Sequence, residues 1–266
     1  MELSIIILNY KSRGLVKNCL KSVLESEIDF PHEIIVVDNN SDDGVENLLK
    51  ENFPQVKLFK MEKNVGMGAG NNIGIKNASG RHILILNPDI FLFADTIKKI
   101  YHYVKDRSDV GLVGPRLLNP DRTLQHTCYA FHKFWTPLFR RTPLGRFSFA
   151  ENELNRFLMT DWDHNTNRPV DWIQGSCVLI PKKVLDEVGL FDERFFMYFE
   201  DTDLCRRIIN AGYKNIYLAD SEAIHFHGRQ SAEGGYFKFL FNKLTRIHII
   251  SWIKYMVKWK GQNRAK

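Results

Sequence analysis

The chain has 266 residues, of which 44% are hydrophobic and 26% are charged, and its formal net charge is +6. This composition is typical of a globular protein with a substantial core, and it excludes low-complexity and disordered classes. Four widely spaced cysteines, none in a CxxC pair, indicate neither a zinc site nor a disulfide framework, so we expect reduced thiols. No apolar stretch reaches the ~18 residues of a membrane span, and the first residues show no signal-peptide pattern.

The first 115 residues alternate between strand and helix patterns. Apolar, β-branched runs predict strands at 3–8, 33–37, 56–59, 82–86 and 110–113, and helical spacing predicts helices at 15–24, 45–49, 69–77 and 96–104. This alternation predicts an α/β fold with an open, mainly parallel central sheet and flanking helices on both faces. Ligands bind where such strands end, so Asn9, Asp38 and Asp89, which follow three of them, are expected to share one site.

The second half is less regular at first. Residues 115–170 are rich in Arg, Pro and aromatics, and we expect an excursion from the sheet that is suited to a second substrate. A core pattern returns at 171–180, followed by a helix at 182–188, an acidic motif whose helix runs to Ala211, and a strand at 215–218.

The acidic motif is the strongest chemical signal. Four aromatics lie between Phe195 and Phe199, and Glu200, Asp201 and Asp203 follow directly, with two arginines after them. An apolar wall beside a carboxylate holds a general base partly desolvated, so the motif indicates an enzyme that removes a proton here. Asp203 fits better as a helix cap or as a partner of one of the arginines.

These pieces in this order resemble family 2 glycosyltransferases of the GT-A fold, and most closely the rhamnosyltransferase-like enzymes of bacterial surface polysaccharide synthesis. The motifs that carry the resemblance are Ile7-Leu8-Asn9-Tyr10, Val36-Val37-Asp38-Asn39-Asn40-Ser41, Asn64-Val65-Gly66 with Asn71-Asn72-Ile73-Gly74, Asn87-Pro88-Asp89, Gly175-Ser176, and Phe199 through Cys205. The resemblance implies a GT-A catalytic domain at 1–231, with a nucleotide-binding half (1–115) and an acceptor-binding half (116–231), followed by a basic amphipathic tail at 232–266.

The resemblance implies that a nucleotide-diphosphate sugar binds in the first half. The implied contacts are Asn9, Tyr10, Asp38, Asn40, Asn64, Gly66, Asn72 and Asn87. In isolation Asp38 fits equally well as a cap of the next helix. Gly70 and Gly74 are better explained by close helix–sheet packing. A dinucleotide-binding loop does not fit, because these glycines do not follow the first strand.

A divalent cation, Mg²⁺ or Mn²⁺, is implied at the place of the family's DxD motif. The expected ligands are Asp89, His225 and His227, and the cation would neutralise the departing diphosphate. Asn87 stands at the first acidic position, which leaves Asp89 as the one sure carboxylate ligand of this motif. A simple Asn-Pro-Asp turn and structural histidines are the alternatives.

The resemblance also assigns the reaction. Asp201 would be the general base of an inverting transfer, and Glu200 would orient it or bind the acceptor. Trp172, Gln174 and Gly175 would form the acceptor wall, and a buried core role for Trp172 is nearly as good an explanation. The donor that the resemblance favours is dTDP-rhamnose, and UDP-linked sugars are the alternative. A nucleotidyltransferase and a catalytically silent sugar-binding subunit are the rival classes.

The end of the chain is basic and amphipathic. Residues 234–266 hold eight Lys and Arg and no Asp or Glu, and apolar residues recur there at helical spacing. This pattern predicts a helix lying in a membrane surface, which suits a lipid-linked acceptor and a cytoplasmic protein on the inner face of the membrane. The alternative is a helix that packs on the catalytic domain or on a partner in a homodimer. A nucleic-acid partner is not expected, since no recognition motif is present.

Overall fold

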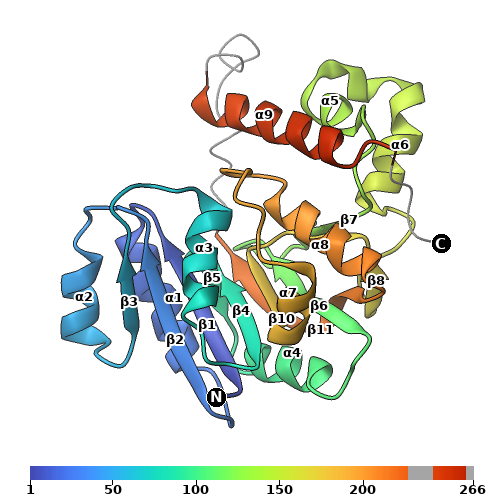
Figure 1. The fold of residues 1–266 in the computed structure, drawn as a ribbon. Helices are drawn as coiled ribbons and strands as arrows, with labels where there is room; N and C mark the ends of the chain where they lie inside the picture. The colour runs from blue at the N-terminus through green and yellow to red at the C-terminus, as the bar shows by residue number, and fades with distance from the viewer. Residues whose placement is uncertain (227–241, 262–266) are drawn as a thin grey trace.

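The computed structural model describes residues 1–226 and 242–261. Over these residues a large mixed sheet runs through the molecule with helices on both faces (Figure 1). The strands are β1 (Leu3–Asn9), β2 (His32–Asp38), β3 (Lys57–Lys60), β4 (His82–Leu86), β5 (Ile90–Leu92), β6 (Val110–Leu118), β7 (Cys128–Tyr129), β8 (Arg168–Val170), β9 (Trp172–Ile173), β10 (Cys177–Pro181) and β11 (Lys214–His225).

The helices are distributed along the whole chain. They are α1 (Arg13–Leu24), α2 (Val45–Asn52), α3 (Met67–Lys76), α4 (Thr96–Val104), α5 (Thr136–Arg141), the 3-10 turn η1 (Pro143–Arg146), α6 (Ser148–Leu158), α7 (Lys182–Val188), α8 (Glu200–Asn210) and α9 (Lys243–Lys258).

The direction of the strands confirms a mainly parallel sheet. Its order is β3-β2-β1-β4-β10-β6-β11-β5, with β8 paired to β11. The pairs β1–β2, β1–β4, β2–β3 and β6–β11 are parallel, whereas β10 runs antiparallel between β4 and β6. The carboxyl ends of β1, β2, β4 and β6 therefore meet at one edge, and this edge holds the candidate site.

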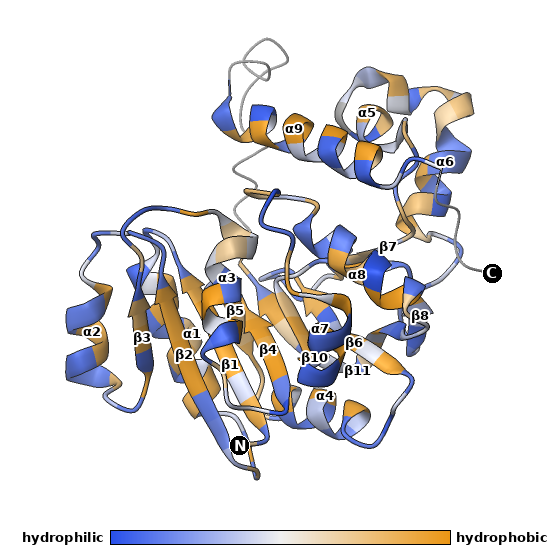
Figure 2. Ribbon diagram, viewed as in Figure 1, coloured by the Kyte–Doolittle hydropathy of each residue, from blue (hydrophilic) through white to orange (hydrophobic). Residues whose placement is uncertain are grey.

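Alternation along the strands builds two cores. Leu3, Ile5 and Ile7 of β1 belong to one apolar cluster, which includes side chains of α1 and α4, whereas Ile6 and Leu8 belong to the other, which includes side chains of α3, α7 and α8. Successive side chains of a strand point to opposite faces, so one continuous apolar run fills both cores. Figure 2 shows the resulting hydrophobic colour of the central strands.

The structure differs from the sequence-based expectation mainly in the middle of the chain. The stretch expected to be irregular contains α5, η1 and α6, which form a small helical hairpin. A two-stranded sheet of β7 and β9 joins this region to α8. Strand β5 was not expected, and β6 and β11 are longer than predicted; β11 continues across a register shift between Leu218 and Glu222.

Helix α9 packs on the aromatic run that precedes α8. Tyr255 is fully buried against Phe195 and Phe199, and Ser251 donates a hydrogen bond to the carbonyl of Met197 at 2.8 Å. The described part of the tail therefore packs on the rest of the chain, as the alternative prediction stated. Contact of the tail with a membrane stays a prediction. The predicted boundary between 231 and 232 lies outside the described residues. Across the two described stretches, no helix is both long enough and apolar enough to cross a bilayer.

Candidate active site

Asn9 and Asp38 lie side by side at the ends of β1 and β2. The Asn9 amide is fully buried and donates to Asp38 Oδ1 at 3.1 Å and to Ser41 Oγ at 3.0 Å, while its own oxygen accepts the Ser12 backbone N–H. The Ser41 N–H also donates to Asp38 Oδ1, the pattern of a capping turn. Asn9 therefore fixes the Asp38 carboxylate in place, and their predicted contacts with the nucleotide stay predictions.

The loop that begins at Asn64 is held by a side chain outside the predicted site. Asn39 is buried, donates to Asn64 Oδ1 at 3.0 Å and to the Gly66 carbonyl at 3.1 Å, and accepts the Val65 N–H. Gly66 has a φ of +91°, and a Cβ added there would lie 2.2 Å from the Phe196 carbonyl oxygen. The close approach that requires glycine is thus made to the aromatic run before α8.

Helix α3 packs tightly between this loop and the sheet. An added Cβ at Gly70 would lie 2.6 Å from Leu8, and one at Gly74 would lie 2.5 Å from Ile6, which confirms helix–sheet packing as the reason for both glycines. Asn72 is buried, with its amide hydrogen bonded to the Phe191 backbone on both sides. Its role in donor binding stays a prediction, and so do the roles of Asn87 and of the exposed residues Tyr10 and Asn40.

His225 and Asp89 face each other across the end of the sheet. His225 Nε2 lies 3.3 Å from Asp89 Oδ2, and His225 Nδ1 lies 2.6 Å from Gln125 Oε1. The Gln125 amide donates its own N–H to Asn119 Oδ1 at 3.1 Å, so Gln125 Oε1 is the acceptor and His225 Nδ1 carries a proton. The Nε2 lone pair of a neutral His225 therefore points toward a carboxylate.

This arrangement fits a cation. Two acceptors 3.3 Å apart repel unless a proton or a metal ion lies between them, and Asp89 Oδ1 is buried with no hydrogen-bond partner among the described residues. Within residues 1–226 and 242–261 no group of three His, Cys, Asp or Glu side chains gathers, so other ligands would complete the shell of a metal ion. His227, the third predicted ligand, lies outside the described residues.

Asp201 lies in the first turn of α8 and is oriented by backbone groups. Its Oδ2 accepts the Gly175 N–H at 3.0 Å, and its Oδ1 accepts the Thr202 N–H at 2.7 Å. Oδ1 also accepts the Thr202 hydroxyl at 3.3 Å, so Oδ2 is the oxygen that keeps a second lone pair for a proton from a ligand. Burial raises the pKa of Asp201 above its ordinary value, and these two N–H groups oppose that rise.

Glu200 is the buried neighbour of this carboxylate. It is 6% exposed, and its Oε2 has no hydrogen-bond partner among the described residues. Burial, and then the charge of Asp201, raise the pKa of Glu200 to about 8. Two adjacent acids whose ionisation is mutually unfavourable are typical of sites that hold or move a proton.

The turn into α8 is strained. Tyr198 and Phe199 are consecutive non-glycine residues with a φ of +68°, a region that costs of order 1–3 kcal/mol for such residues. Burial of the Phe199 ring against Tyr255 of α9 helps to hold this conformation. The strained turn places Glu200 and Asp201 at the start of the helix, where its dipole favours the ionised form of a carboxyl group.

Asp201 and Asn87 are connected through two adjacent residues. Gly175 binds the Asp201 carboxylate, and the carbonyl of Ser176 accepts the Asn87 N–H at 2.7 Å. Asp89 follows two residues after Asn87. The predicted base and the predicted metal ligand therefore belong to the same edge of the sheet, where β4 and β10 meet.

The predicted acceptor wall is mostly interior. Trp172 is 7% exposed, stacks on Tyr129 and His132 at 4.7 and 5.4 Å between ring centroids, and donates from Nε1 to the Ala130 carbonyl. Trp172 is therefore surrounded as a buried core residue would be, and its contact with a sugar stays a prediction. Gln174 and Gly175 are partly exposed next to Asp201.

Asp203 is a structural residue, as its position suggested. Its fully buried carboxylate pairs with Arg207 at 2.9 Å, which confirms one of the two expected partners, and with Lys258 of α9 at 2.6 Å. It also accepts the Trp259 indole N–H.

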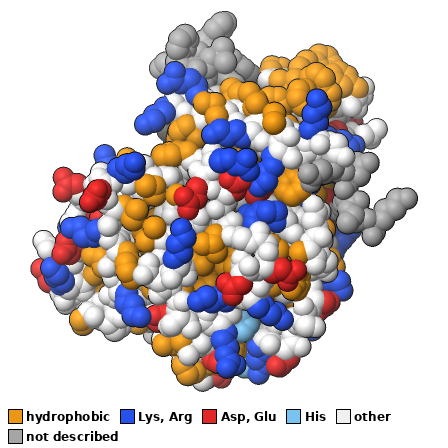
Figure 3. Space-filling model, in the orientation of Figure 1, with side chains coloured by type: hydrophobic (Ala, Val, Ile, Leu, Met, Phe, Trp, Pro, Cys, Tyr) orange, Lys and Arg blue, Asp and Glu red, His pale blue; other side chains and the backbone are white. Residues whose placement is uncertain are grey.

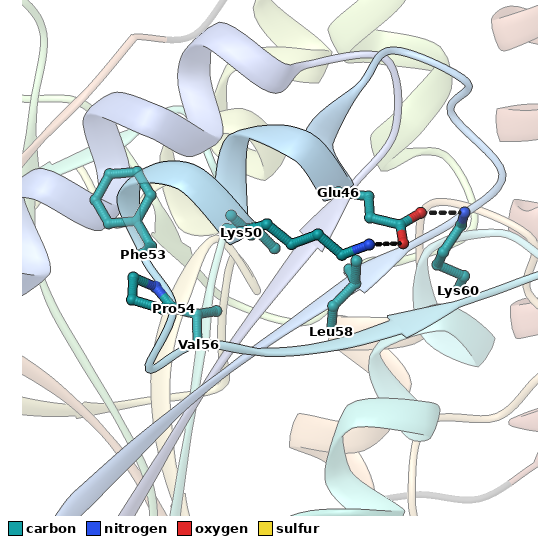
Figure 4. Close-up of a pocket in the computed structure, with 8 residues that line it drawn as sticks. Glu46, Lys50, Phe53, Pro54, Val56, Leu58 and Lys60 are labelled. Carbon is teal, nitrogen blue, oxygen red and sulfur yellow. Dashed lines mark hydrogen bonds and ion pairs between the residues drawn. The ribbon is translucent and has the colours of Figure 1, made fainter.

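A hollow of about 370 Å³ lies between α2 and β3, away from these groups (Figure 4). Its polar lining is an ion-paired triplet in which Glu46 accepts from Lys50 and Lys60. None of the predicted site residues lines it, so we do not place the active site there.

Sequence reasoning missed Asn39 and Gln125. Asn39 lies in the motif that contains Asp38 and Asn40, and only its contacts in the structure distinguish it from these neighbours. Gln125 lies a hundred residues before His225 in a loop without any recognisable pattern. No signal in a single sequence could have found it.

Comparison with known proteins gives a family match over most of the chain. Residues 2–247 match the family model described as "Glycosyltransferase like family 2". The chain is similar to N-acetylglucosaminyl-diphospho-decaprenol L-rhamnosyltransferase of Mycobacterium tuberculosis, with 26% identity over 73% of this chain and 66% of that protein. It therefore spans about two thirds of that relative's length. Rhamnosyltransferase WbbL of Escherichia coli is 26% identical over 96% of this chain and 92% of its own length.

The fold has solved counterparts. The crystal structure of GalNAc-T7 with UDP, GalNAc and Mn²⁺ matches with a TM-score of 0.70 over 98% of this chain and 48% of that one, at 15% identity. At this identity the likeness shows the fold, which is the predicted GT-A fold.

Proposed function

The chain belongs to glycosyltransferase-like family 2, and on this premise we propose an inverting transfer of a sugar from a nucleotide-diphosphate donor to a saccharide hydroxyl. The two rhamnosyltransferase relatives favour dTDP-rhamnose as the donor, with a UDP-linked sugar second. A lipid-linked acceptor is proposed because the mycobacterial relative is named for a diphospho-decaprenol substrate.

In the proposed reaction Asp201 accepts the proton of the acceptor hydroxyl. The hydroxyl oxygen forms a bond to the anomeric carbon while the bond from that carbon to the phosphate oxygen breaks, and the nucleoside diphosphate leaves. The N–H groups of Gly175 and Thr202 aim the carboxylate, and the buried Glu200 keeps a second acid beside it. Attack from the side opposite to the leaving group inverts the anomeric centre.

The donor would lie along the ends of β1, β2 and β4. Asp38, fixed by Asn9, is placed to accept hydrogen bonds from a base or a ribose, as the resemblance implies. Asp89 and His225 would hold a divalent cation, and such a cation neutralises charge on a departing diphosphate. Mn²⁺ is present in the GalNAc-T7 structure, and the choice between Mg²⁺ and Mn²⁺ for this chain is part of the proposal.

One observation carries the proposal. The contacts Asp201–Gly175 and Ser176–Asn87 bring the predicted base to the strand end that bears Asp89. A catalytically silent subunit would not require a carboxylate aimed by two backbone donors beside a buried second acid whose Oε2 has no hydrogen-bond partner among the described residues.

The test separates binding from chemistry. Thermal-shift measurements with dTDP, UDP and GDP, each with and without Mn²⁺, should identify the nucleotide; a shift with none of them would contradict the donor site. With the stabilising nucleotide known, Asp201→Asn should lower kcat by about 10²–10⁴-fold while donor binding is retained. Asp163→Asn, at an exposed carboxylate, is the matched control. Undiminished transfer by Asp201→Asn would assign the base elsewhere, and pyrophosphate release from a nucleoside triphosphate would indicate a nucleotidyltransferase.

A further inference from the structure

The helical hairpin of α5, η1 and α6 exposes an unusual number of large apolar side chains. Five of them are between 39% and 63% exposed: Phe134, Trp135, Leu144, Phe147 and Phe149. The rings of Phe147 and Phe149 stack at 5.7 Å, and those of Phe134 and Trp135 meet edge to face at 4.9 Å. Scattered single apolar residues are normal on a surface, but a contiguous aromatic patch marks an interaction site.

Helix α9 adds a second apolar strip. Its inner face is buried through Tyr255, while Ile250, Ile253 and Val257 are 51%, 50% and 69% exposed. Their spacing of three and four residues places them on one face of the helix. Exposed Lys243 and Arg246 precede this strip, and Lys260 follows it.

The two surfaces are joined and lie at the active-site end. Phe134 contacts Trp252 of α9, with 5.2 Å between ring centroids. Figure 1 shows α9 beside α5 and α6, beyond the ends toward which β1 and β2 run. Figure 3 shows apolar side chains gathered over α5, with lysine and arginine side chains along α9.

We propose that this joint surface docks the protein on an anionic lipid bilayer. Aromatic rings and aliphatic side chains would enter the headgroup region, where Trp and Phe are favoured, while the basic residues around them would face acidic lipid headgroups. Charge supports this partner: residues 131–160 hold five Lys and Arg against two Glu, and α9 has no acid. Glu153 pairs with Lys133 and Arg156, and the stretch as a whole has an excess of three positive charges.

The assignment changes where the membrane contact is placed. The sequence predicts it in the tail alone, but much of the apolar surface of α9 is used against the catalytic domain. The hairpin supplies the exposed aromatic rings that α9 lacks. The surface goes beyond the proposed transfer reaction, because vesicle binding needs neither donor nor acceptor.

Co-sedimentation of the full chain with vesicles tests the proposal. With phosphatidylcholine vesicles containing about one third phosphatidylglycerol, Phe147→Ser combined with Phe149→Ser should lower the partition coefficient about tenfold or more. Lys243→Gln combined with Arg246→Gln should lower it roughly thirtyfold on these vesicles and much less on pure phosphatidylcholine. Leu24→Ser on α1, where the side chain is 44% exposed, is the matched control and should bind as the wild type does.

Two results would overturn the proposal. Unchanged pelleting of the Phe147/Phe149 variant, with its melting temperature preserved, would exclude the bilayer as the partner. A dimer seen by light scattering that this variant dissociates, without any change in vesicle binding, would instead assign the surface to a second copy of the chain. A chain that binds vesicles but transfers no sugar would refute the proposed function and leave this surface intact.

Discussion

Replacing Gln125 by methionine should weaken the proposed metal binding, because Gln125 orients the histidine that would bind the ion. Gln125 Oε1 accepts a hydrogen bond from the Nδ1–H group of His225 at 2.6 Å, and this bond leaves Nε2 as the nitrogen that faces Asp89. Methionine has nearly the same length and volume but offers no comparable acceptor. The change therefore removes the hydrogen bonds to His225 and to Asn119 and leaves the apolar packing of the loop nearly intact.

The size of the effect follows from the burial of the ring. His225 is 1% exposed, so an N–H left without its acceptor costs about 1–3 kcal/mol. Loss of an outer-shell partner of a metal-binding histidine typically costs 10–100-fold in metal affinity, which is about 1.4–2.7 kcal/mol. The two ranges agree, so we expect Mn²⁺ affinity to fall at least tenfold in Gln125→Met.

The assay measures Mn²⁺ binding itself, by electron paramagnetic resonance titration in the presence of saturating nucleoside diphosphate. Gln125→Glu, which keeps an acceptor oxygen, should retain most of the affinity, and Gln55→Met, at an exposed position, should retain all of it. Nitrogen-15 spectra of labelled histidine provide a second readout, with a proton on Nδ1 expected in the wild type.

Either of two results would refute this reasoning. One is Mn²⁺ affinity within twofold of the wild type in Gln125→Met, and the other is a wild-type His225 that carries its proton on Nε2 alone. In the first case the hydrogen bond would be structural; in the second, the imidazole would have no lone pair to offer at this position.

Further predictions concern the acids, the loop and α9. The raised pKa of Glu200 means that the unfolding free energy of the wild type falls as pH rises from 4.5 to about 8, because the folded form keeps a proton that the unfolded chain releases; Glu200→Gln should flatten this slope in thermal melts, and parallel slopes would contradict it. Burial also raises the pKa of Asp201, so the kcat/KM of the wild type should fall at low pH as Asp201 is protonated, and this fall should occur at a higher pH than for an ordinary aspartate. Gly66→Ala should cost about 2 kcal/mol or more in urea unfolding, since its Cβ would meet the Phe196 carbonyl; an unchanged midpoint would show that the loop can yield. Tyr255→Ala should cost about 3–5 kcal/mol and expose α9 to limited proteolysis, whereas Tyr255→Phe should not.

Much of the fold was predictable because the strands are unambiguous. Apolar runs that follow one another with short polar turns leave few alternatives to a parallel sheet, and the polar residues after them mark its carboxyl edge. The direction of β10 was not predictable, since a short buried run reads the same in either orientation. The hairpin of α5 and α6 was missed because its apolar residues are exposed, so they do not follow the spacing of a helix that covers a core.

The residues of the candidate site were predictable to the extent that they stand in local motifs. Asp201, Glu200 and Asp89 stand in such motifs, and the structure brings their elements to one edge. The residues that position them are non-local: Gly175 reaches Asp201 across 26 residues, and Gln125 reaches His225 across 100. Contacts of this kind depend on how loops fold back over the sheet, which no spacing in the sequence encodes.

Asp203 links α8 to α9, so we expect the two helices to move together. Its carboxylate binds Lys258 and the Trp259 indole at the end of α9, two residues beyond Asp201 on α8. If the outer face of α9 rests on lipid, Asp201, the proposed base, lies at a fixed distance from the headgroups. This distance then determines which hydroxyl of a lipid-linked acceptor can reach Asp201. We expect lipid-linked acceptors to react only when the number of sugars between the lipid phosphate and the reacting hydroxyl matches that distance, so a graded series of acceptors should show one sharp optimum.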